Sequence, residues 1–88
     1  MDISDWRKKI DEIDQEIIRL LNQRAGYSME ICKIKNHHGY SIHDPDREKK
    51  IFRSITQCNN GPLSNQAMLN IYQAVVQECR NLQQDNNA

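Results

Sequence analysis

A single helical pattern runs from about Ser4 to about His37 without an internal proline, in a chain of only 88 residues. Apolar residues recur along it at intervals of three and four, as they do on the buried face of an amphipathic helix. They include Ile10, Ile13, Ile17, Leu20, Leu21, Ile31 and Ile34. At about 1.5 Å per residue, such a helix would be roughly 50 Å long. A globule of this size cannot enclose it, so the helix must project and find a partner.

Two connecting segments between helices, the first joint and the second joint, divide the rest of the chain. In the first, Gly39 is a helix stop, and Asp44 followed by Pro45 is a helix start. In the second, "CNNGPLSN" supplies turn residues and a capping serine. The sequence therefore predicts one all-α domain over residues 1–88, with one long helix and two shorter ones. The predicted helices span about 4–37, 45–58 and 65–84.

Composition excludes several classes of protein. Twelve basic and twelve acidic residues give a net charge of zero, whereas a general nucleic-acid binder usually carries a net positive charge. No apolar run approaches the ~20 residues of a membrane span, and no signal-peptide core follows Met1. Three cysteines at wide, unpatterned spacing favour free thiols over a disulfide framework or a zinc site. We expect a cytoplasmic protein that binds neither membrane nor metal.

Charged residues interrupt the apolar face of the long helix. Steps of three and four residues along this face pass through Arg7, Asp14, Arg24 and Lys35. Each long cation alone could reach solvent while its stem lies on apolar neighbours. The set is harder to explain in this way, because the other helices supply polar residues at positions expected to face it. These are Asp44, Arg47, Glu48 and Gln83.

Together these residues predict a polar pocket inside a helical bundle. Taken singly, the acids of "DPDRE" suit a helix N-terminus, and Gln83 suits a surface. As a group, they complete a site rich in arginine and lysine. Guanidinium groups match carboxylates in a bidentate way, so the pocket suits a small dianion.

Spacing along the helix predicts the oligomeric state. Arg24 and Lys35 are eleven residues apart on nearly the same face, or roughly 16 Å, so their side chains can converge on one ligand. Arg7 lies seventeen residues before Arg24, or roughly 25 Å away, out of reach of that ligand. If Arg7 serves the site, it comes from an antiparallel helix of a second subunit. A C2 homodimer would then hold two shared sites.

Three stretches resemble the all-helical (type II) chorismate mutases: "WRKKIDEIDQEIIRLLNQRAGYSMEICKIK", "GYSIHDPDREKKIF" and "GPLSNQAMLNIYQAVVQECRNLQ". The resemblance covers nearly the whole chain, and the combination of R-x-x-I-D-x-I-D, L-L-x-x-R, K-x-K, D-P-x-R-E, G-P-L and a terminal glutamine is highly specific. That family isomerises chorismate to prephenate by a [3,3]-sigmatropic rearrangement, at the branch point towards phenylalanine and tyrosine. It is an intertwined homodimer of three-helix subunits. The resemblance implies the same fold and activity here.

The resemblance also implies how the substrate is held. Arg24 would bind one carboxylate, the partner subunit's Arg7 the second, and Arg47 would support a carboxylate directly or through water. Lys35 and Gln83 would hydrogen-bond the ether oxygen of the breaking C–O bond. A unimolecular pericyclic shift needs no nucleophile, general base, metal or cofactor. Catalysis would come from holding the enolpyruvyl arm in its reactive geometry, with fixed donors at the oxygen that gains charge.

Two further contacts and two departures complete the comparison with the family. Glu48 would accept a hydrogen bond from the ring hydroxyl, and Asp44 would act there mainly through its backbone. Cys79 stands where several members have a serine that touches a carboxylate, and a thiol is a weaker donor. Gln83 replaces a glutamate of some relatives, which must be protonated to donate. We therefore expect no acidic optimum.

Other functions remain open. Isochorismate–pyruvate lyases of siderophore synthesis look similar and share a basic pocket, although "DPDRE" and Gln83 look more like the mutase. A non-catalytic or regulatory module is a second alternative, because mutase-like domains occur fused to other aromatic-pathway enzymes. A fused or bound enzyme of that pathway is thus an alternative partner. A coiled-coil interaction protein is a third, for which ionisable residues on the apolar face would be poor choices.

Overall fold

The structure is a computed structural model that describes residues 1–41 and 44–86. These residues form three helices and no strand: α1 (Ile3–His38), α2 (Pro45–Cys58) and α3 (Asn65–Asn86). The predicted all-α class, with one long helix and two shorter ones, is confirmed. None of the described helices is both long enough and apolar enough to cross a membrane.

Local capping chemistry decides where the helices begin and end. Asp2 caps α1, because its carboxylate accepts from the backbone N–H of Asp5 at 3.1 Å while the Asp5 carboxylate accepts from the Asp2 N–H at 2.9 Å. This capping box starts α1 one residue before the expected Ser4. At the other end, Gly39 adopts a left-handed backbone with φ 72°, a conformation that glycine reaches without strain.

Asp44 and Ser64 begin the two shorter helices. The Asp44 carboxylate accepts from the backbone N–H of Arg47 at 3.1 Å, and Pro45 follows at the first helical position. The Ser64 hydroxyl accepts from the backbone N–H of Ala67 at 3.0 Å. The Asp44 cap begins α2 directly after the first joint, so the charged side chains of the first turn of α2 lie at that point.

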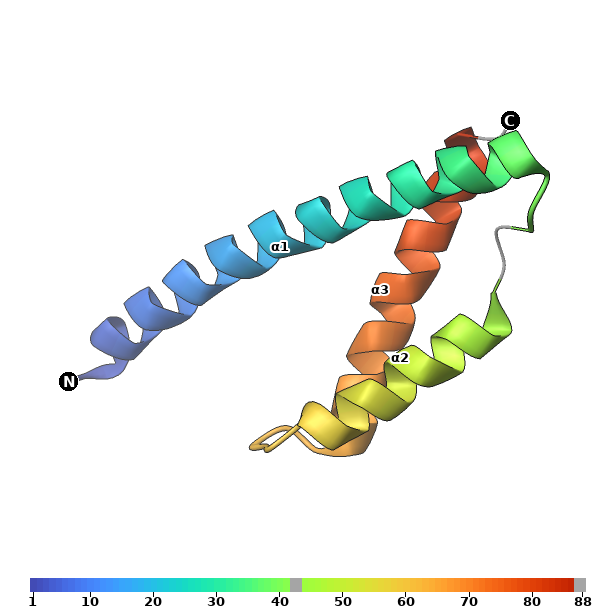
Figure 1. Cartoon of the computed structure of the whole chain (residues 1–88). Helices are drawn as coiled ribbons and strands as arrows, with labels where there is room; N and C mark the ends of the chain where they lie inside the picture. The colour runs from blue at the N-terminus through green and yellow to red at the C-terminus, as the bar shows by residue number, and fades with distance from the viewer. Residues whose placement is uncertain (42–43, 87–88) are drawn as a thin grey trace.

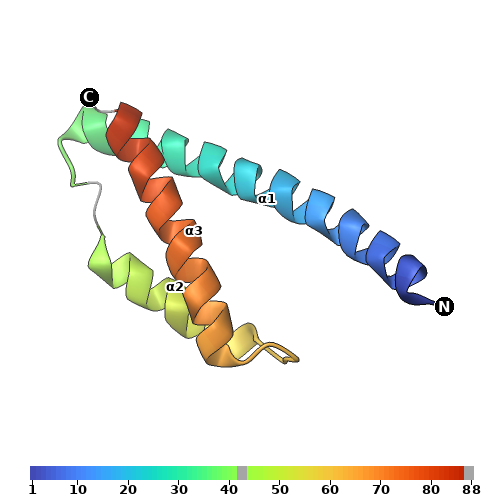
Figure 2. The same cartoon turned by 180° about the vertical axis from the view of Figure 1, so that it is seen from behind.

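The three helices are arranged as an open frame with one long projecting arm. Figures 1 and 2 show α3 packed against α2 along its first half and crossing α1 near the C-terminal ends of both helices. The N-terminal half of α1 is this projecting arm, and it extends away from the other two helices without touching them. The chain accordingly measures 55 × 24 × 15 Å along its principal axes.

The chain has almost no core of its own. In the described part of the chain, Cys32 and Cys79 are the buried apolar residues. Large apolar side chains along α1 remain open instead, with Trp6 57% and Ile13 58% exposed. Monomeric soluble proteins rarely expose contiguous apolar surface on this scale. The chain therefore leaves the apolar face of its longest helix without cover.

Candidate active site

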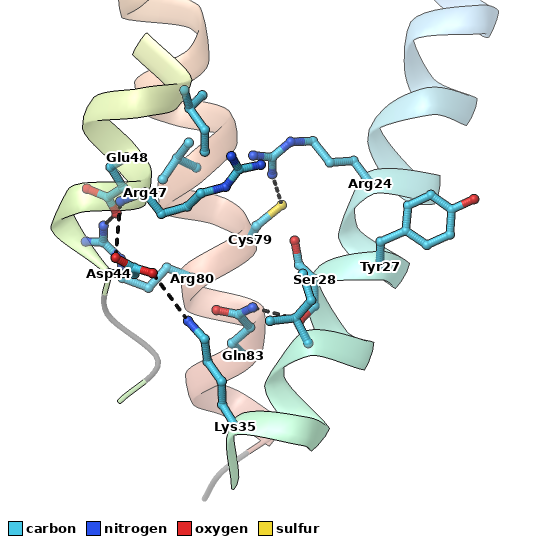
Figure 3. Close-up of a pocket in the computed structure, with 13 residues that line it drawn as sticks. Arg24, Tyr27, Ser28, Lys35, Asp44, Arg47, Glu48, Cys79, Arg80 and Gln83 are labelled. Carbon is cyan, nitrogen blue, oxygen red and sulfur yellow. Dashed lines mark hydrogen bonds and ion pairs between the residues drawn. The ribbon is translucent and has the colours of Figure 1, made fainter. Parts of the chain in front are cut away.

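A cavity of about 260 Å³ lies between the C-terminal half of α1, the first turns of α2 and the second half of α3. Figure 3 shows side chains from all three helices around it. Seven of the eight site residues predicted from the sequence line this cavity: Arg24, Lys35, Asp44, Arg47, Glu48, Cys79 and Gln83. Tyr27, Ser28, Ile31, Ile51, Val76 and Arg80 complete the lining.

Arg7 is the predicted site residue that this cavity lacks. It lies on the projecting arm of α1, where its side chain is exposed. Its seventeen-residue separation from Arg24 corresponds to roughly 25 Å along a continuous helix. Arg7 cannot contact a small ligand in the cavity of the same chain.

Arg24 is held against α3 by a weak acceptor. Its Nη1 donates to the Sγ of Cys79 at 3.1 Å, and Cys79 is buried. A guanidinium has five N–H donors, and a thiol sulfur is a poor acceptor. Arg24 therefore keeps most of its hydrogen-bonding capacity for an anion in the cavity.

Gln83 is fixed by contacts between α3 and α1. Its Nε2 donates to the backbone carbonyl of Ser28 at 2.8 Å. Its own backbone carbonyl accepts from the thiol of Cys32 at 3.8 Å. An amide nitrogen carries two hydrogens. One is used on Ser28, so the second can serve a ligand.

Lys35 and Asp44 face each other across the first joint. Lys35 Nζ lies 4.0 Å from Asp44 Oδ2, while Asp44 Oδ1 caps α2. An ion pair this long, with the Asp44 side chain about half exposed, contributes little to stability. The ammonium group of Lys35 is therefore available to a ligand that offers better acceptors.

Arg80 is the charged residue of the cavity that sequence reasoning missed. It forms an ion pair with Glu48, joining α3 to α2, as Figure 3 shows. Its spacing could have revealed it, because Arg80 precedes Gln83 by three residues and follows Val76 by four. Residues at such intervals share one face of a helix.

The charges around the cavity leave it positive. Four cations and two carboxylates line it, which is an excess of two positive charges. The cations are Arg24, Lys35, Arg47 and Arg80, and the carboxylates are Asp44 and Glu48. No group of three or more His, Cys, Asp or Glu side chains in the described residues is placed to hold a metal ion. The arrangement suits a small molecule with two negative charges.

Comparison with known proteins identifies the family. Residues 6–84 match the family model for chorismate mutase type II. The chain belongs to this family. It is 34% identical to a chorismate mutase from Methanocaldococcus jannaschii over 82 residues, which covers 92% of this chain and 83% of that protein. The resemblance seen in the sequence is therefore confirmed.

Bifunctional proteins also contain a similar region. The chain is 37% identical over 86 residues to a bifunctional chorismate mutase/prephenate dehydratase from Aquifex aeolicus. The match covers 93% of this chain and 24% of that protein. The chain thus spans about a quarter of the length of this relative.

Solved structures share the three-helix fold. The Form II structure of chorismate mutase from Thermus thermophilus matches with a TM-score of 0.91 at 27% identity, over 93% of each chain. The chorismate mutase from Helicobacter pylori, solved in complex with prephenate, matches with a TM-score of 0.86 at 26% identity. That match covers 94% of this chain and 90% of the Helicobacter chain.

Proposed function

We propose that this protein is a chorismate mutase, an isomerase that converts chorismate to prephenate. The observation that carries the proposal is the cavity with two excess positive charges, lined by cations from all three helices. Chorismate carries two carboxylates, so its charge complements this excess. Membership of the chorismate mutase type II family supports the same activity.

Substrate binding rests on the arginines. Arg24 binds one carboxylate with the donors that its contact to Cys79 leaves free. Arg47 extends from the first turn of α2 toward Arg24 (Figure 3) and supports a carboxylate directly or through water. Once the partner subunit's Arg7 also binds the second carboxylate, the enolpyruvyl arm is restricted to the geometry in which the new C–C bond can form. The free energy of binding then offsets the entropy lost when this arm is ordered, before the chemical step.

Two donors act on the ether oxygen. As the C–O bond breaks, this oxygen gains negative charge, and Lys35 and Gln83 hydrogen-bond it. Fixed donors aimed at developing charge stabilise a transition state more than the ground state. The contact of Gln83 with the Ser28 carbonyl fixes its amide in advance. Glu48 accepts from the ring hydroxyl, and Asp44, whose side chain caps α2, lies beside it on the same turn. No step needs a cofactor.

The site is completed by a second copy of the chain. The uncovered apolar face of α1 supports a homodimer in which the projecting arms of two subunits pack together. An antiparallel C2 pairing brings the partner subunit's Arg7 to the cavity, where it binds the second carboxylate. Each dimer then holds two shared sites. The free thiols of Cys32, Cys58 and Cys79 support a reducing, cytoplasmic setting.

A further partner is proposed from the bifunctional relatives. Because similar regions occur within chorismate mutase/prephenate dehydratase proteins, an aromatic-pathway enzyme, fused or bound, is a candidate neighbour. The basic pocket would also accept isochorismate, the substrate of the related lyases. Isochorismate is therefore the second substrate to test beside chorismate.

The first test is turnover of chorismate by the purified protein, followed by loss of its absorbance. Lys35→Ala removes the charged donor at the ether oxygen, so kcat should fall at least about a hundredfold. The dimer should persist in sedimentation. Lys33→Ala is the matched control, because Lys33 is exposed and pairs with Glu30 outside the cavity. Near-normal turnover by Lys35→Ala would overturn the assignment of this residue. Release of pyruvate from isochorismate at a comparable rate would favour the lyase.

A further inference from the structure

The ion pair between Arg80 and Glu48 has no part in the function proposed above, although it lies in the wall of the cavity. It joins α3 to α2, and the two side chains are 22% and 24% exposed. Both are more enclosed than a typical surface pair, such as Arg19 with Glu16 at 60% and 58%. Water therefore screens the Arg80–Glu48 attraction less.

Arg80 is anchored on both sides of its guanidinium. Nη2 contacts Oε1 of Glu48, and Nη1 donates to Oε1 of Gln77 at 3.4 Å, one turn earlier on α3. A carboxylate can accept about four hydrogen bonds. Even two hydrogen bonds from the guanidinium would use about half of this capacity, so the carboxylate can still accept from a hydroxyl in the cavity.

We propose that Arg80 is a positioning residue that acts through Glu48. This inference rests on the proposed function, in which Glu48 accepts from the ring hydroxyl of the substrate. Arg80 holds the carboxylate at the wall of the cavity, so the acceptor is in place before the substrate binds. It also offsets the negative charge of Glu48. Without Arg80, the excess charge of the cavity falls from two to one, and the Glu48 carboxylate loses the cation that is paired with it.

A direct contact between Arg80 and the substrate makes a different prediction. A residue that binds the substrate itself contributes whether or not Glu48 is charged. A residue that acts through Glu48 contributes only while the carboxylate is present. The two roles are therefore separated by a double-mutant cycle, which measures the coupling between residues in contact.

The experiment measures kcat/KM for chorismate in Arg80→Met, Glu48→Gln and the double variant, with each dimer checked by sedimentation. Arg80→Met should lower kcat/KM about tenfold in the wild-type background, and less than about twofold in Glu48→Gln. Arg80→Lys, which keeps a cation beside Glu48, should recover much of the loss. Arg53→Met is the control, since it removes an exposed arginine of α2 outside the cavity and should leave kcat/KM unchanged. If Arg80→Met does not fold, Arg80→Gln replaces it in the cycle.

Three results would overturn the proposal. Equal losses from the Arg80 substitution in both backgrounds would mean that Arg80 acts independently of Glu48. A lysine variant no better than the methionine variant would exclude a role for the positive charge. Full kcat/KM in Arg80→Met would remove the role altogether. A wild-type protein without chorismate turnover would instead refute the proposed function, and this inference with it.

Discussion

Two inactive variants should restore activity when they share one dimer. In the proposed dimer, each site takes Arg24 and Lys35 from one subunit and Arg7 from the other. The reason is distance, since seventeen helical residues, or roughly 25 Å, separate Arg7 from Arg24. Arg7→Ala and Lys35→Ala homodimers each carry a defect in both sites. A mixed dimer gathers both substitutions in one site and leaves the other site intact.

The size of the rescue follows from the symmetry. Equal amounts of two freely pairing chains give half mixed dimers, and half of the sites in those dimers are intact. Activity per site should therefore return to about a quarter of the wild-type value. Mixed dimers isolated on their own should reach about half.

The assay uses co-expressed chains with two different affinity tags, purified in tandem, and follows the loss of chorismate absorbance. Lys35→Ala combined with Arg24→Ala is the matched control, because both residues belong to the same subunit of each site. That pair leaves every site defective and should show no rescue. Absence of rescue in the Arg7 pair, or equal rescue in both pairs, would refute the shared site.

Substitutions at two further positions test the site and the fold. Gln83→Glu should lose activity near neutral pH and regain it as pH falls, because a carboxyl donates to the ether oxygen only when protonated; a pH–rate profile without a rise in acid would contradict this. The wild type should show no such rise. Asp44→Ala removes the cap of α2 and should cost about 1 kcal/mol in urea unfolding at fixed protein concentration. Asp44→Asn keeps the acceptor, so its free energy of unfolding should stay near that of the wild type. Equal stability of the wild type and both variants would show that the Asp44 side chain does not stabilise α2 as a cap.

Helical spacing was enough to predict much of the cavity. Arg24 and Lys35 interrupt the apolar face of α1 at intervals that place them on one side of the helix, and both line the cavity. Gln83, which alone suits a surface, was grouped with them because its place on the third helix was expected to face the long helix, and it also lines the cavity. The helical period fixes which residues of one helix share a face, so spacing alone could place Arg24 and Lys35 on the same side of α1.

Helical spacing could not predict the contacts between different helices. The pairing of Arg80 with Glu48 depends on how α2 docks against α3, and no periodicity within one helix contains this information. The contact between Arg24 and Cys79 arises in the same way, across α1 and α3. The apolar pattern of α1 likewise predicted a face that needs cover, without the geometry of what covers it.

The most direct test of the central claim is the product itself. Purified protein incubated with chorismate should give the proton NMR spectrum of prephenate as the substrate signals disappear, with no pyruvate formed. A parallel sample that contains the Lys35→Ala variant should keep the chorismate spectrum over that time, apart from the slow uncatalysed reaction. A wild-type spectrum that changes no faster than chorismate alone would contradict the account.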